Sequence, residues 1–156
     1  SRALGPGETQ YLEGLPLTIC RDDFTLVHGS PREPIWEYLL STSSARINFA
    51  YFKTNFCLVG HSHVPLMFES TDEGQCLLSG LPPDTPLNLE GRRLIINPGG
   101  VGQPRDGDPR ASYAIYDSDD GAIYHYRIPY DIAVTQQRMA KRGLPLSLAE
   151  RLSFGW

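Results

Sequence analysis

The chain has 156 residues, of which 40% are hydrophobic and 21% charged, as expected for one globular domain with a buried core. Its formal net charge of −4 provides no basic patch for a nucleic-acid backbone, so we expect any bound phosphate to require metal cations. No apolar stretch approaches the ~18 residues of a membrane span, and three cysteines without a CxxC pair favour neither a disulfide framework nor a structural zinc site. These features predict a cytoplasmic protein without membrane or nucleic-acid partners.

The first half of the chain alternates between helices and short strands. A helix is predicted over residues 8–13, ending at Gly14. Two more helices are predicted, one opening at Pro34 and one after Ser43. Apolar strands are predicted at residues 24–27, 56–59 and 94–96. Each strand is followed by polar or glycine-rich residues, which are candidate functional positions.

The second half turns to β-structure and then to helix. Residues 111–116 and 122–128 flank an acidic turn and predict an antiparallel hairpin. Asp131 is a suitable cap for a following helix, and Ser147 with Glu150 has the spacing of a capping box. The fold class predicted from these patterns is mixed α/β.

Three of the four histidines follow apolar strands. His28 lies in VHGSP, while His61 and His63 lie in VGHSHVP. In an extended segment, residues i and i+2 project to the same side, so His61 and His63 can present ring nitrogens to one pocket. With His28 they are three candidate metal ligands, although a single histidine at a strand end is more often a hydrogen-bonded side chain. His125, within the predicted hairpin, is interpreted as structural.

A loop dense in glycine and proline, INPGGVGQPRDG, covers residues 96–107. Its backbone amides are able to form an anion-binding nest, and Arg105 is suited to bidentate contact with phosphate. Asn97 and Arg105 are therefore candidate substrate-binding residues, and the loop is expected to border the histidine pocket. The alternatives are a tight connection to the hairpin and a surface arginine paired with Asp106 or Asp108.

The order VHGSP, VGHSHVP, INPGGVGQPRDGDPRASYAIYD resembles the C-terminal signature of the small prokaryotic branch of the calcineurin-like metallophosphoesterases, over most of the chain. The resemblance implies a four-layer αββα sandwich in which two divalent metal ions hydrolyse phosphodiesters or phosphomonoesters. It also implies that His28 and His61 bind one ion and His63 the other. Imidazole is a suitable ligand for Mn, Fe, Zn and Ni alike, so the ligands do not determine the identity of the metal.

The family's other signatures, DxH, GDxxD and GNHD, do not occur in the sequence. We therefore expect residues 1–156 to be the C-terminal portion of a single domain, with the N-terminal strands and the general acid missing. Such a chain is expected to hold at most one metal weakly and to be inactive by itself. The strands that end at His28 and His61 would then be exposed sheet edges through which the chain oligomerises.

Two readings from other classes are possible. A non-catalytic interaction scaffold on the same fold would lack metal chemistry, but the three retained histidines argue against it. A cupin-like barrel would explain His61 and His63 followed by Glu69. The spacing to that glutamate is too long, and the second cupin motif has no counterpart.

Overall fold

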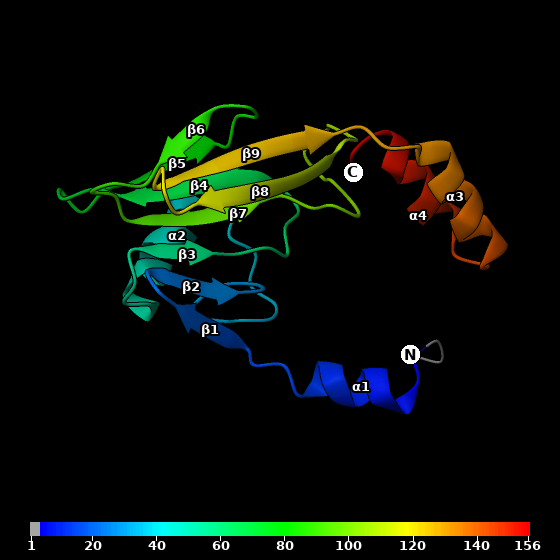
Figure 1. Ribbon diagram of the computed structural model, residues 1–156, viewed down its shortest axis with the longest axis horizontal. Coiled ribbons are helices and arrows are strands. Elements are labelled where there is room, and N and C mark those ends of the chain that lie inside the picture. The colour runs from blue at the N-terminus through cyan, green and yellow to red at the C-terminus, as the bar shows by residue number, and fades with distance from the viewer. Residues whose placement is uncertain (1–3) are drawn as a thin grey trace.

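The computed structural model describes residues 4–156 as a mixed α/β fold with two sheets (Figure 1). The strands are β1 (Thr18–Arg21), β2 (Phe24–Val27), β3 (Phe56–Leu58), β4 (Pro65–Ser70), β5 (Cys76–Gly80), β6 (Pro86–Asn88), β7 (Leu94–Pro98), β8 (Ala111–Asp117) and β9 (Ala122–Ile128). The helices are α1 (Pro6–Glu13), α2 (Thr42–Asn48), α3 (Ile132–Lys141) and α4 (Leu146–Glu150), with 3-10 turns η1 (Phe49–Tyr51) and η2 (Arg151–Ser153). Within residues 4–156, no helix has the length and apolar character needed to cross a membrane.

The larger sheet has six strands in the order β1-β2-β3-β7-β4-β5, and the smaller has three in the order β6-β9-β8. Strands β2, β3 and β7 are parallel neighbours, so their carboxyl ends meet at one end of the sheet. β1 pairs with the outer side of β2. The expectation that the strands ending at His28 and His61 form edges is therefore wrong, because both are interior and the free edges are β1 and β5.

The larger sheet is covered on both faces because alternate residues of its buried strands point in opposite directions. On one face, Val27, Cys57 and Ile95 pack with residues of α2 and η1. On the other, Phe56 and Ile96 pack with residues of the smaller sheet. The layers are thus helix, sheet and sheet, while α3 and α4 lie beyond the end of β9 (Figure 1).

Most of the local signals in the sequence have a structural counterpart. The predicted hairpin is formed by β8 and β9. The side chain of Asp131 accepts a hydrogen bond from the backbone N–H of Val134 at the start of α3, and Ser41 caps α2 in the same way through Ser44. The first helix starts two residues earlier than predicted, at Pro6, where proline is favoured because its missing N–H is not needed.

Two helix predictions are wrong. No helix opens at Pro34, because the Glu37 side chain bonds to Ser30 and to Asn48, and these tertiary contacts hold the segment as an irregular loop. The capping box at Ser147 is not formed either. The helix α4 begins one residue before Ser147, which places that serine inside the helix.

Candidate metal centre

The rings of His28 and His61 face each other at the carboxyl end of the parallel strands. His28 directly follows β2, and a hydrogen bond of 2.8 Å from the Gly60 N–H to the His28 carbonyl joins the two chain segments. His28 Nε2 and His61 Nδ1 are 3.0 Å apart. With metal–nitrogen bonds of about 2.0–2.1 Å, two nitrogens at that separation subtend about 91–97° at a shared ion, which is a normal angle between adjacent ligands. The pair therefore fits one divalent cation.

His63 presents a nitrogen separately from this pair. Its Nδ1 lies 2.7 Å from the carbonyl oxygen of Gln103, which only accepts, so Nδ1 carries the proton and Nε2 of the neutral ring is the unprotonated nitrogen. A backbone carbonyl behind a histidine is the usual support of a metal ligand. Within residues 4–156, no three His, Cys, Asp or Glu side chains form one group able to hold an ion, so His63 does not join His28 and His61 in a three-residue site.

The backbone at His61 and His63 is not extended, although the spacing of two residues between these histidines predicted an extended segment. His61 has φ of 61° and His63 has φ of 60°, both in the left-handed region. The segment is a tight turn, in which the Ser62 N–H donates to the Gly60 carbonyl. The two histidines are therefore held by a turn rather than by the extended segment that their spacing predicted.

Two aromatic residues that the sequence patterns did not single out surround His61. The ring of Tyr38 stacks on it at 4.0 Å between centroids, and the ring of Trp36 lies 6.5 Å from it between centroids, at a steep angle of 76°. Burial lowers the pKa of His61, and the neighbouring His28 lowers it further, while the Trp36 carbonyl opposes the shift. These surroundings favour the neutral imidazole that metal binding requires. In the sequence, Trp36 and Tyr38 could have been noticed as two aromatic residues at alternate positions after the first histidine motif.

Asn97 is buried beneath the histidine turn. Its Nδ2 donates to the Gly60 carbonyl at 2.7 Å and to Ser62 Oγ at 2.9 Å, and its Oδ1 accepts from the Gly99 N–H at 2.9 Å. These contacts fasten the turn to the glycine-rich loop. They favour a positioning role for Asn97 over the direct substrate contact expected from the sequence.

The loop that follows β7 borders the same site. The Gln103 carbonyl contacts His63, and the Arg105 N–H donates to the His63 carbonyl at 3.3 Å. The Arg105 guanidinium bonds to the Gln103 side chain at 2.7 and 3.1 Å. The alternative pairing with Asp106 or Asp108 is wrong, since both carboxylates bond to other arginines. The positive charge of Arg105 also makes a small contribution to the lowered pKa of His61, after burial and the charge of His28.

His125 lies apart from this site, within the hairpin. It is 1% exposed, and its Nε2 is 2.7 Å from Ser112 Oγ, which in turn donates to the Pro98 carbonyl. This buried hydrogen-bond chain ties the hairpin to β7 and agrees with a structural role.

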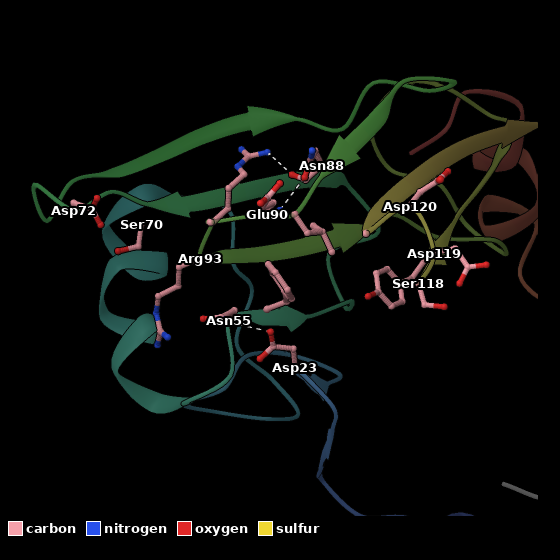
Figure 2. Close-up of a pocket in the computed structure, with 16 residues that line it drawn as sticks. Asp23, Asn55, Ser70, Asp72, Asn88, Glu90, Arg93, Ser118, Asp119 and Asp120 are labelled. Atoms are coloured by element: carbon pink, nitrogen blue, oxygen red, sulfur yellow. Dashed lines mark hydrogen bonds between the residues drawn. The ribbon is translucent and has the colours of Figure 1, made fainter.

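A cavity of about 630 Å³ lies at the other end of the sheet (Figure 2). It is lined by Asp23, Asn55 and Arg93, which directly precede β2, β3 and β7. None of the four histidines lines this cavity, so it is separate from the candidate metal centre. A second hollow, of about 540 Å³, has His28 at its rim and is otherwise mostly apolar, lined by residues of α1, β1 and the segment between them.

Known proteins share the fold of this chain. An uncharacterized protein of Methanocaldococcus jannaschii is 37% identical over 152 residues, covering 94% of this chain and 59% of that protein. The crystal structure of a metallophosphoesterase from Sphaerobacter thermophilus superposes with a TM-score of 0.94 at 46% identity, covering 99% of this chain and 64% of the other. A hypothetical protein from Pyrococcus horikoshii shares the fold, with a TM-score of 0.74 at 21% identity over 99% of this chain and 57% of its own.

The chain therefore spans less than two thirds of the length of each of these relatives. Residues 5–121, well over half of the chain, match the family model of the calcineurin-like phosphoesterase superfamily domain. This match includes the histidine and glycine-loop segments described above. The chain belongs to the calcineurin-like phosphoesterase superfamily.

Proposed function

We propose that this chain contributes histidine ligands to a two-metal centre that hydrolyses phosphate esters, and that it is inactive by itself. The observation that carries the proposal is the 3.0 Å separation of His28 Nε2 and His61 Nδ1 at the ends of adjacent parallel strands. Two unprotonated ring nitrogens repel each other at this distance unless a proton or a cation lies between them. Members of this superfamily generally use divalent metal ions, which supports the cation.

In the proposed site, His28 and His61 hold one ion and His63 holds the other. The Gln103 carbonyl fixes the tautomer of His63, and Tyr38 fixes the plane of the His61 ring. When bound, divalent ions would neutralise phosphoryl oxygens and activate a water molecule as nucleophile. Imidazole accepts Mn²⁺, Fe²⁺, Zn²⁺ and Ni²⁺, so the proposal does not select among them.

Arg105 is proposed to bind the substrate phosphate. A guanidinium carries five N–H donors, and its two contacts with Gln103 leave others for an anion while holding the planar group in place. Its charge also opposes the formal net charge of −4, which repels phosphate at long range. The substrate class is a phosphomonoester or a phosphodiester.

Isothermal titration calorimetry of the chain with Mn²⁺ and Zn²⁺ tests the ligand assignment. His28→Ala and His61→Ala are expected to abolish binding at the shared site, because each removes one of two protein ligands. His125→Gln is the control, with its fold checked by circular dichroism, because this histidine is buried away from the site. Unchanged metal binding in the His28→Ala and His61→Ala variants would refute the assignment.

Hydrolysis is tested on the protein expressed from its complete reading frame. Bis(p-nitrophenyl) phosphate and p-nitrophenyl phosphate report diester and monoester cleavage with each divalent metal in turn. We expect metal-dependent release of nitrophenol that is lost with His61→Ala. Absence of release with every metal would instead favour a non-catalytic scaffold.

A further inference from the structure

The loop between β2 and α2 presents Trp36 to solvent next to the histidine pair. Trp36 is 73% exposed, and its ring centre is 6.5 Å from that of His61. Tyr38 is 47% exposed and commits one ring face to His61 by stacking. The two aromatic residues therefore differ in how much ring surface a ligand can reach. Tyr38 supports the histidine, while the larger ring of Trp36 remains open to a ligand.

Buried residues hold this loop in place although its aromatic side chains are exposed. The Glu33 carboxylate accepts the backbone N–H of Trp36, and the Glu37 carboxylate turns inward to Ser30 and Asn48, both fully buried. Gly29 leaves no room for a side chain, since a Cβ there would lie 2.9 Å from the Glu33 carbonyl oxygen. A ring that is already positioned loses little freedom when a ligand stacks on it.

Two residues near His61 are suited to two different parts of one ligand. Arg105 donates its backbone N–H to the carbonyl of His63, two residues from His61, and its guanidinium is suited to an anion. The ring of Trp36 has its centre 6.5 Å from that of the same imidazole and is largely exposed, so its surface is open to stacking by a flat aromatic ring. A ligand that carries a phosphate and an aromatic ring would satisfy both.

We infer that Trp36 is a specificity-determining residue that stacks on the aromatic group of a phosphate ester, either a nucleobase or an aryl ring. The inference rests on the proposed function, because the phosphate must lie at the metal-binding histidines for the ring to reach Trp36. Tyr38 is a positioning residue in this arrangement. Stacking on an aromatic side chain is expected to raise affinity about tenfold over an ester without a ring.

The test is calorimetric titration of the Mn²⁺-loaded chain with adenosine 5′-monophosphate, phenyl phosphate and ribose 5-phosphate. We expect the two aromatic compounds to bind about tenfold more tightly than ribose 5-phosphate. Trp36→Ala should remove this preference without changing the affinity for ribose 5-phosphate, and Trp36→Phe should keep part of it. Tyr51→Ala is the matched control, because Tyr51 is 56% exposed in η1, whose neighbours Phe49 and Phe52 bond to Arg93 at the opposite end of β7.

Fluorescence gives a second readout. In a Trp156→Phe background Trp36 is the sole tryptophan, and its emission should be quenched by adenosine 5′-monophosphate but not by ribose 5-phosphate. Equal affinities for all three compounds, or a preference that survives Trp36→Ala, would overturn the inference and leave the proposed function intact. Failure to bind Mn²⁺ or any of the phosphates would overturn both. The relative affinity of the two aromatic compounds assigns the ring to a nucleobase or to an aryl group.

Discussion

His28 Nε2 and His61 Nδ1 lie 3.0 Å apart although the two residues are separated by 33 positions in the chain. Parallel pairing of β2 with β3 brings their carboxyl ends together, and the Gly60 N–H bonds to the His28 carbonyl just beyond the paired residues. The geometry of the candidate metal centre is therefore a property of the sheet and of the turn that follows it.

Asn97 should support both stability and metal binding. Asn97→Ala would remove three hydrogen bonds, leaving the Gly99 N–H without a partner and the Gly60 carbonyl with the Ser62 N–H alone, at a cost of about 2–3 kcal/mol of unfolding free energy. Because the histidine turn loses its support, Mn²⁺ affinity should also fall about tenfold. Asn55→Ala, at an exposed position, should change stability by less than about 0.5 kcal/mol in the same urea titrations. Equal stability of the two variants would contradict the assignment.

The glycine-rich loop should tolerate a side chain at one position but not at another with the same backbone. Gly99 and Gly107 have φ of 86° and 85°, so alanine at either pays a left-handed penalty of about 1–2 kcal/mol. Only at Gly99 would the Cβ also collide with Ser112, 2.5 Å from its Oγ, whereas nothing lies within 4 Å at Gly107. Gly99→Ala should therefore be clearly less stable than Gly107→Ala in thermal melts. Similar melting temperatures would show that the loop moves aside freely.

Burial of His125 should make stability depend on pH. Desolvation lowers the pKa of His125, so below about pH 6.5 the unfolded chain binds a proton more readily than the folded one. The free energy of unfolding should therefore be greatest above about pH 6.5 and fall as the pH decreases, by up to ~1.4 kcal/mol per pH unit from this group. His61 has a lowered pKa and adds to the slope in the same direction. Urea titrations at several pH values should give a shallower slope for His125→Gln, and an unchanged slope would exclude His125 as a source.

Phosphate affinity should depend on Arg105 while metal affinity does not. Arg105→Ala is expected to weaken binding of inorganic phosphate to the Mn²⁺-loaded chain by about tenfold, because a charge-assisted contact is lost. Mn²⁺ affinity in the same variant should stay level or rise slightly, since a positive charge near His61 is removed. Arg138→Ala, exposed on α3, is the control. Parallel loss of metal and phosphate binding would assign Arg105 a structural role.

Part of the site could be predicted from sequence because its signals are local. Each histidine motif follows an apolar strand, and parallel strands in one sheet bring such positions together. Helix caps such as Asp131 could likewise be predicted from the residue type at the start of a helix. These features depend on residues adjacent in the chain.

Other features depended on contacts that a local pattern does not contain. The segment after Pro34 has the spacing of a helix, but Glu37 bonds to Ser30 and to Asn48, and these tertiary contacts hold an irregular loop instead. For the same reason the aromatic surroundings of His61 were missed, because Tyr38 reaches that ring only once the loop is folded. The position of β1 outside β2 was also not predicted, and it changes which strand is the sheet edge.

The free edge at β1 leads to a prediction about self-association. Among residues 4–156, β1 pairs with β2 alone, so one side of its backbone has unpaired donors and acceptors. The side chains of Ile19 on β1 and of Leu17 just before it are exposed. An exposed apolar edge invites pairing with another chain, and a charge on the edge prevents it. We therefore predict that the isolated chain forms oligomers that Ile19→Lys shifts to monomer. Analytical ultracentrifugation over a range of concentrations measures the shift.

The opposite edge provides the control for this prediction. Leu77 on β5 is 47% exposed, as is Ile19, and β5 pairs only with β4. Leu77→Lys adds the same charge to an edge at the far side of the sheet, so it should leave the oligomers intact if β1 is the contact. Dissociation by Leu77→Lys alone would place the contact at β5, and a wild-type chain that stays monomeric at high concentration would show that neither edge associates. β1 also borders the hollow beside His28, so the effect of Ile19→Lys on metal binding must be measured as well. Ile19→Lys should weaken association through β1 without any loss of Mn²⁺ affinity, since neither β1 nor Ile19 supplies a metal ligand.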